Sequence, residues 1–196
     1  MKNLGKLALL GAALAVSASS AFATTFSTTG QFSNGLSNMT FGSGGDTLTL
    51  SFIGDNDVSI ITPSFANFGV ITATSTGAGA TASGAFTLNF SQSVPTSGTG
   101  SLFGSLSGSI STNSSLGVIN FSTMSLVLSP STYTIQQPVG GYFLVPPSTG
   151  PTGKTPGATT IQGFVTTTPE PNSLMLLGTG LVSGAGMLMR RRRTIA

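Results

Sequence analysis

Two neighbouring aspartates, Asp55 and Asp57, come closest in this chain to a catalytic or metal-binding pattern. On an extended strand their carboxylates would share one face at roughly 6.5–7 Å. Carboxylates paired in this way can hydrolyse a glycosidic bond or donate oxygen ligands to Ca²⁺. The surrounding stretch, IGDNDVS, is also typical of a turn, in which Asp and Asn bond their own backbone. We predict a turn, keep a weak Ca²⁺ site as the alternative, and disfavour catalysis.

Other catalytic arrangements are restricted by the absence of histidine and cysteine from the 196 residues. Ser-His-Asp and Cys-His nucleophiles are therefore impossible, as are disulfides and thiolate or imidazole metal sites. A Ser–Lys pair would need Lys154, which lies in GPTGKTPG, a flexible and solvated context that does not activate a lysine. We expect no enzymatic activity and no cofactor.

The formal net charge of +3 comes from basic residues near the two ends of the chain, and the middle of the chain is acidic. Between Thr24 and Pro171 one lysine stands against four carboxylates, a net charge of −3. The other positive charges are all terminal: Lys2, Lys6, Arg190, Arg191, Arg192 and Arg193. Nucleic-acid binding needs a clustered basic surface, so we expect no nucleic-acid partner.

The first 23 residues have the pattern of a secretory signal peptide. Lys2 and Lys6 precede an apolar core from Leu7 to Val16, which is too short to span about 30 Å of hydrocarbon. Ala21 and Ala23 supply the small residues of a cleavage site. We predict that signal peptidase removes residues 1–23 and that the mature chain begins at Thr24.

The C-terminal tail, residues 169–196, combines three features in a fixed order. Pro169-Glu170-Pro171 is followed by an uncharged apolar segment, 173–189, and then by Arg190–Arg193. A helix over 173–189 would be roughly 26 Å long, the short end of a transmembrane span. The positive-inside rule keeps the arginines in the cytoplasm as a membrane stop, which leaves the Pro-Glu-Pro tripeptide on the outer side.

This tail resembles the PEP-CTERM sorting signal of exported proteins in Gram-negative bacteria. The resemblance implies that Pro169, Glu170 and Pro171 are recognised by an exosortase, a membrane-embedded, cysteine-type transpeptidase-like enzyme that removes the tail. It implies an inner-membrane intermediate, followed by display at the cell surface or release. Carriers of the signal are often linked to exopolysaccharide, biofilm or extracellular matrix. The alternative is an ordinary single-helix anchor with a stop-transfer cluster.

Between the ends, period-two alternation indicates strands. The clearest are DTLTLSFI (46–53), AFTLNFS (85–91) and NFSTMSLVLS (120–129). We predict an all-β fold, an antiparallel sandwich or jelly-roll, over residues 24–137, flanked by the signal peptide and the C-terminal transmembrane helix. Residues 138–168 are rich in proline and glycine and predict a loop or stalk, with a possible last strand in ATTIQGFV.

One internal repeat, GSLFGSLSGSIS, consists of three tetrads from Gly100 to Ser111. A period of four is even, so on a strand Leu102, Leu106 and Ile110 would share one face with the glycines. A flexible low-complexity linker is the alternative.

The aromatic residues Tyr133, Tyr142 and Phe143 either pack in the core or form a face that stacks on sugars. The function we expect is that of an exported, exosortase-processed surface or matrix protein, structural or adhesive and non-catalytic. The alternatives are an extracellular carbohydrate-binding module, with exopolysaccharide as partner, and a plain membrane-anchored surface protein.

Overall fold

The computed structural model describes residues 22–150, 153–168 and 177–184. The chain divides into a compact unit, Phe22–Thr167, which we call the β-domain, and a second unit made of the two terminal segments. The predicted signal peptide up to Ala21, the tripeptide 169–171 and the arginines 190–193 lie outside the described residues. Of the apolar segment 173–189, residues 177–184 are described and are helical; no described helix is long and apolar enough to cross a membrane.

The β-domain is built from two antiparallel sheets and a small hairpin. Sheet A has the order β12-β9-β7-β6-β1-β4, with β8 also paired to β7. Its strands are β1 (Phe22–Phe32), β4 (Val58–Thr62), β6 (Ala80–Val94), β7 (Gly98–Ser111), β8 (Ser114–Ser115), β9 (Val118–Phe121) and β12 (Tyr142–Phe143).

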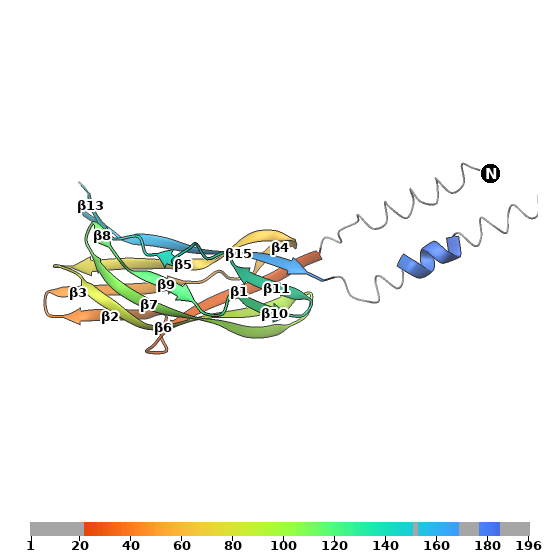
Figure 1. Ribbon diagram of the computed structural model, residues 1–196, viewed down its shortest axis with the longest axis horizontal. Coiled ribbons are helices and arrows are strands. Elements are labelled where there is room, and N and C mark those ends of the chain that lie inside the picture. The colour runs from red at the N-terminus through yellow and green to blue at the C-terminus, as the bar shows by residue number, and fades with distance from the viewer. Residues whose placement is uncertain (1–21, 151–152, 169–176, 185–196) are drawn as a thin grey trace, which may run out of the picture. The chain divides into compact units, whose positions relative to one another are not determined.

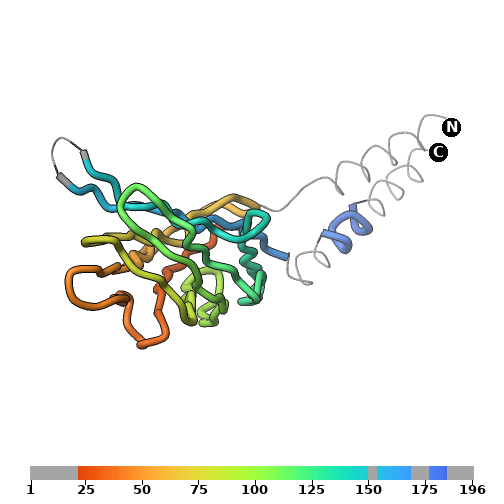
Figure 2. The backbone as a smooth tube through the Cα atoms, turned by 60° about the vertical axis from the view of Figure 1, so that its left-hand side comes forward, coloured from red at the N-terminus to blue at the C-terminus, as the bar shows by residue number. Residues whose placement is uncertain are grey.

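Sheet B has the order β10-β11-β15-β5-β3-β2. Its strands are β2 (Asn38–Ser43), β3 (Asp46–Ile53), β5 (Ser64–Thr76), β10 (Ser125–Leu128), β11 (Ser131–Ile135) and β15 (Gly157–Thr167). The hairpin of β13 (Ser148–Gly150) and β14 (Gly153–Thr155) projects from the body of the β-domain (Figure 2). The predicted all-β, antiparallel class is confirmed.

The core lies between the inner faces of the two sheets and follows the predicted alternation. Residues 48, 50 and 52 of β3 are buried, as are residues 86, 88 and 90 of β6. Aromatic rings join the sheets: the centroids of Phe52 in sheet B and Phe86 in sheet A are 5.5 Å apart, and those of Phe68 and Phe26 are 5.8 Å apart. Tilted and edge-to-face aromatic packing of this kind supplies large buried apolar areas without any disulfide.

The glycine tetrads form strand β7 rather than a linker. Leu102, Leu106 and Ile110 are buried on its inner face, as predicted. The intervening glycines allow close approach: a Cβ at Gly100 would lie 2.6 Å from Leu126 Cδ1, and one at Gly104 would lie 3.0 Å from the carbonyl oxygen of Asn120.

The stretch 120–129, which alternation presents as one strand, is divided between the sheets. β9 ends at Phe121 in sheet A, and β10 begins at Ser125 in sheet B. Leu128 is buried and Val127 is exposed, as alternation along a strand requires, whereas Met124 precedes the strand and is exposed. Alternation therefore identifies the inward faces but not the point at which the chain changes sheets.

Residues 138–168, expected as a loop or stalk, contain four strands. The possible last strand in ATTIQGFV is β15, which lies between β11 and β5 within sheet B. Its inward residues Ile161 and Val165 are fully buried. The β-domain therefore extends to Thr167, because the proline- and glycine-rich part is a set of turns leading into a central strand.

The chain enters and leaves the β-domain at the same end, which we call the exit end. β1 begins there with Phe22 beside Thr62 of β4, and β15 ends there with Thr167 beside Ser131 of β11 (Figure 1). The opposite end, which we call the far end, holds the β2–β3 and β5–β6 turns and the β13–β14 hairpin.

Candidate functional site

The aspartate pair lies on the loop that carries the chain from β3 in sheet B to β4 in sheet A. The loop is bound along β1: the Thr28 amide donates to Asp55 O (2.8 Å), and the Asp55 amide donates to the Thr28 hydroxyl (3.0 Å). The Asp57 amide donates to the Ser27 hydroxyl (2.9 Å), and Asp57 has a positive φ of 47°. These residues form a backbone-bonded loop, as the turn interpretation predicts.

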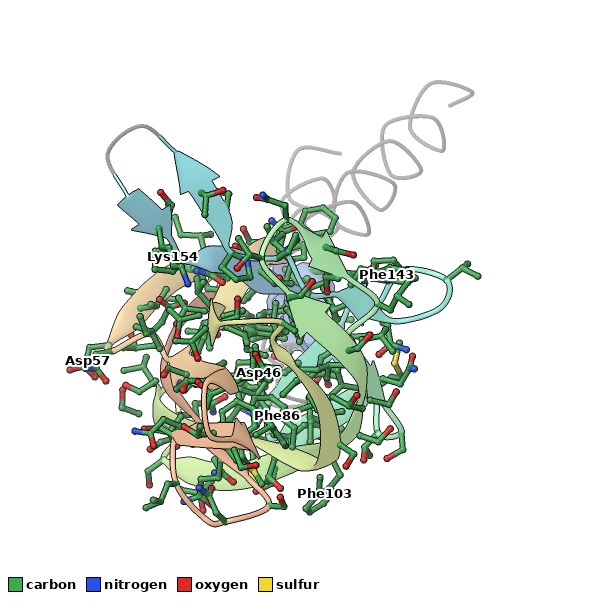
Figure 3. All side chains as sticks on the ribbon, turned by 90° about the vertical axis from the view of Figure 1, so that its left-hand side faces the viewer. Asp46, Asp57, Phe86, Phe103, Phe143 and Lys154 are labelled. Carbon is green, nitrogen blue, oxygen red and sulfur yellow. The ribbon has the colours of Figure 1, made fainter. Side chains whose placement is uncertain are left out.

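The two carboxylates have different surroundings and do not share a cleft. Asp57 is exposed at the periphery of the β-domain (Figure 3). Asp55 is partly buried, and its Oδ2 atom is buried without a hydrogen bond to the protein. Burial raises the pKa of Asp55 above its usual value of 3.8. Within the described residues no group of three or more acidic side chains gathers that would support the calcium alternative.

Lys154 lies on β14 and is engaged in a structural hydrogen bond. Its ammonium donates to the carbonyl oxygen of Ser75 (3.1 Å), which ties the β13–β14 hairpin to β5. The Ser75 hydroxyl instead bonds the Thr112 hydroxyl (3.1 Å). Lys154 therefore contacts the backbone of this serine and not its potential nucleophile.

The three aromatic residues considered as a sugar-stacking face do not form one. Tyr133 and Tyr142 are buried; the Tyr133 hydroxyl donates to Gln92 Oε1 (2.8 Å), and that of Tyr142 lies 2.7 Å from Gln162 O. Burial raises the pKa of both phenols. Phe143 is exposed at the β12 margin of sheet A (Figure 3). Core packing is thus the role of both tyrosines.

A polar surface that sequence reasoning did not identify covers the outer face of sheet A. Six outward side chains from three adjacent strands line an open depression with a volume of about 340 Å³. We call this surface the hydroxyl grid: Ser27, Thr29, Asn89, Ser91, Thr99 and Ser101. Phe103, exposed on the same face, occupies the next row of β7. No local sequence pattern indicates that these residues meet, because only the strand order places β1, β6 and β7 side by side.

A cluster of hydroxyls holds the first and last strands together at the exit end. The Thr62 hydroxyl donates to the carbonyl oxygen of Phe22 (3.0 Å) and lies 2.7 Å from the hydroxyl of Thr167. Because a hydroxyl has one proton, Thr167 is the donor to Thr62. Thr62 is fully buried, so one side chain joins the two points at which the chain enters and leaves the domain.

Two further buried polar contacts cross the exit end. The Thr24 hydroxyl lies 3.3 Å from that of Ser131. Gln92 accepts from Tyr133, donates to Thr96 O (2.8 Å), and thereby fixes the turn between β6 and β7. The predicted cleavage between Ala23 and Thr24 falls inside β1, whose first residues pair with Thr62 and Ile61. Cleavage at that position removes the first two residues of the strand.

The outer faces at the exit end carry exposed apolar side chains on both sheets. We call this set the exit collar: Ile61 on β4, Phe65 on β5, Val94 on β6 and Val127 on β10. Phe65 and Phe164 are paired across β5 and β15 with ring centroids 5.0 Å apart. The collar surrounds the point from which the C-terminal tail leaves.

The tail follows the β-domain directly. β15 ends at Thr167, so the tripeptide 169–171 begins two residues after a central strand. No curated protein and no solved structure matches this chain. One family model does match, over residues 167–193 only, and it confirms the resemblance seen in the tail: the chain carries a PEP-CTERM protein-sorting motif at its C-terminal end.

Proposed function

We propose that this chain is an exosortase-processed protein of the cell surface or extracellular matrix, and that its β-domain has a structural or adhesive, non-catalytic role. The observation that carries the proposal is the sorting motif at residues 167–193, which indicates an exported protein targeted to an exosortase. The motif is joined without a spacer to the last strand of the domain. Removal of the tail would leave the β-domain as the delivered product.

The non-catalytic part of the proposal is supported by the surroundings of the charged side chains. Asp55 and Asp57 are bound into a loop along β1, and Lys154 is bound to a backbone carbonyl. Asp46 accepts from the Ala78 amide (2.7 Å) and closes the β5–β6 turn. The backbone amides of Asp55 and Asp57 and the side chains of Asp46 and Lys154 thus make contacts that shape a loop, a turn and a hairpin, as expected of a structural domain.

Intact-mass analysis of the protein recovered from cells with and without a functional exosortase tests the sorting step. We expect the product of exosortase-positive cells to lack the mass of Arg190–Arg193, and the product of exosortase-negative cells to retain it. Retention in both strains would leave a plain membrane-anchored surface protein.

A matched pair of variants tests whether the exosortase recognises the Pro-Glu-Pro tripeptide or whether the tail is only a membrane anchor. Glu170→Ala alters the tripeptide and should preserve the tail in exosortase-positive cells. Asn172→Ala changes the neighbouring residue outside the tripeptide and should be processed normally. Equal processing of both variants would contradict recognition through the tripeptide.

The structural role is tested by complementing a deletion strain and measuring biofilm cohesion and retention of exopolysaccharide. We expect the wild-type chain and the double variant Asp55→Asn/Asp57→Asn to restore both properties equally. Failure of the double variant, with a folded protein present at the cell surface, would favour a catalytic or calcium-dependent role.

A carbohydrate-binding module is the second candidate, and the hydroxyl grid is the observation that favours it. Hydroxyl and amide groups on a flat face, with Phe103 exposed beside them, are suited to hydrogen-bond and stack on a polysaccharide chain. Binding of the β-domain to exopolysaccharide should then fall at least tenfold for Phe103→Ala and remain unchanged for Phe143→Ala, an equally accessible phenylalanine at the β12 margin. Absence of any glycan signal would exclude this candidate.

A further inference from the structure

The exit end combines buried polar side chains with exposed apolar ones, in contrast to the region of sheet A that carries the hydroxyl grid. In the middle of the sheet the outer face carries the hydroxyl grid, and the inner face carries phenylalanine and leucine. At the exit end Thr24, Thr62 and Gln92 are buried, whereas the exit collar is exposed. Exposed apolar side chains gathered in one region indicate a surface that meets an apolar partner.

The exit collar involves both sheets and lies near the point of exit. Ile61 is 69% exposed and pairs with Ala23 near the start of β1. Val127 is 67% exposed and lies in the row of β10 and β11 that continues to Thr166 of β15. The collar thus faces outward on either side of the residues that connect the domain to its tail.

The length of the connection places this end close to the apolar tail segment. Only residues 168–172 separate Thr167 from the apolar stretch that begins at Ser173. Six residue steps cover at most roughly 20 Å when fully extended. The polar interface of a bilayer itself takes up roughly 5–7 Å on each side. A membrane-inserted tail therefore keeps the exit end within a short distance of the lipid headgroups.

The charge distribution agrees with this location. Among the described residues no charged side chain belongs to the collar; Asp46 and Lys154 lie at the far end, and Asp55 and Asp57 lie halfway along β1. Carboxylates are repelled by anionic lipid. Because these aspartates lie away from the exit end, this repulsion would be weak when that end approaches a membrane. Cleavage before Thr24 would add one α-ammonium group at this end, which anionic headgroups attract.

We propose that the exit collar is a lipid-contact surface. While the tail is inserted in the membrane, the collar holds the exit end of the β-domain against the membrane–water interface on the outer side of that membrane. The proposal rests on the proposed function, since it requires an inserted tail. The proposal adds an orientation to that function, in which the strands run roughly perpendicular to the membrane surface. The tripeptide 169–171 is then held at the interface, where a membrane-embedded exosortase can reach it.

Single labels on the full-length precursor test the proposal, and the absence of native cysteine makes each label unambiguous. Ile61→Cys and Val127→Cys place a fluorophore in the collar. Leu36→Cys and Leu116→Cys are matched controls, because their side chains are 58% and 73% exposed and lie away from the exit end: Leu36 comes after the end of β1, and Leu116 is bonded to Ser109 of β7. The labelled precursors are reconstituted into vesicles of phosphatidylethanolamine and phosphatidylglycerol, with and without a lipid that carries a quencher at the headgroup. Circular dichroism confirms that each variant is folded.

We expect the quencher to reduce the fluorescence of both collar labels at least threefold more than that of both control labels. Equal quenching at all four positions, or none at any, would overturn the lipid-contact surface while flotation of the vesicles still shows the tail to be inserted. Shielding of the collar labels only after exosortase is added would assign the collar to a protein partner and likewise overturn it. Failure of the precursor to float with the vesicles would overturn the inserted tail of the proposed function and the present inference together.

Discussion

The two ends of the β-domain are built from the same strands but are stabilised by different kinds of contact. At the far end, turns are closed by backbone-specific features: Gly77 has a positive φ, and Asp46 accepts the Ala78 amide. At the exit end, the strands are joined by buried hydroxyls such as Thr62, and the outer faces carry apolar side chains. The far end is thus closed by turn-forming contacts and also exposes Leu116, whereas the exit end joins its strands through buried hydroxyls beneath an exposed apolar collar.

This difference shows that the tail continues directly from a hydrogen-bonded strand of the β-domain and not from a flexible stalk. β15 pairs with β5 up to Val165 and with β11 up to Thr167, and the Thr167 hydroxyl is hydrogen-bonded to Thr62. A force or an enzyme acting on the tail therefore acts on a central strand of sheet B. The predictions below test how each end depends on its own kind of contact.

The largest effect is expected for glycines of β7, which runs between the two ends. Gly108, toward the far end, has φ +108°, and a Cβ there would lie 2.1 Å from the carbonyl oxygen of Leu116. Gly108→Ala meets backbone in a conformation that L-residues avoid, so we expect a loss of about 3 kcal/mol or more in the free energy of unfolding. Denaturant unfolding followed by circular dichroism measures it.

Gly100→Ala is the matched substitution in the exit-end half of the same strand. The obstacle there is the end of the Leu126 side chain, 2.6 Å from the added Cβ, and a side chain can move. We expect a loss of about 1 kcal/mol. A cost for Gly100→Ala as large as that for Gly108→Ala would show that both ends are equally intolerant and would weaken the comparison.

The next largest effect is expected for Thr62→Val, which keeps the shape of the side chain and removes its hydroxyl. The carbonyl oxygen of Phe22 loses its donor and Thr167 loses its acceptor at a fully buried site. We expect a loss of about 2 kcal/mol in the free energy of unfolding of a chain that begins at Phe22.

The same substitution in a chain that begins at Thr24 provides the control. Phe22 is absent there, so one of the two partners of Thr62 is already missing and the cost of Thr62→Val should be smaller. Equal costs in the two chains would show that the contact with Phe22 contributes nothing to the joining of the strands.

Much of the strand architecture can be predicted from the sequence, but the hydrogen bonds that join the strands at the exit end cannot. Alternation in 46–53 and 85–91, and the even period of the glycine tetrads, identify inward faces because side-chain direction on a strand is a local property. The partners of Thr62 are 40 and 105 residues away, and no local pattern connects them. The exit collar is also invisible, because Ile60 and Ile61 are both apolar and alternation cannot say which one faces outward.

A third prediction concerns charge in the middle of the domain, between the two ends. Burial raises the pKa of Asp55, and its Oδ2 atom has no hydrogen bond to the protein. The folded state therefore binds the proton more tightly than the unfolded state, and this group makes stability fall as pH rises from 3.8 through the raised pKa. Because water screens a carboxylate that is only partly buried, Asp55→Asn should stabilise the protein at pH 7 only slightly, by about 0.5 kcal/mol or less.

The pH dependence of this variant distinguishes the carboxylate from a simple change of shape. At about pH 2 the carboxyl of Asp55 is protonated in both the folded and the unfolded state, so unfolding curves of the wild type and of Asp55→Asn should coincide. A difference that persists unchanged in acid would mean that the gain does not come from removing a buried charge. Asp57→Asn, at an exposed position on the same loop, should change stability little at either pH.

The smallest effect is expected for Lys154→Met, which removes the positive charge at the far end. Lys154 is exposed and donates one hydrogen bond to Ser75 O, so its loss should cost about 0.5 kcal/mol or less. Amide exchange should quicken in the β13–β14 hairpin and remain unchanged at Thr62 and Thr167. A loss of global stability above about 1 kcal/mol would show that the far end depends on this charge. A small local effect would show that charge at the far end is replaceable, as expected if the proposed attachment of the domain lies at its uncharged exit end.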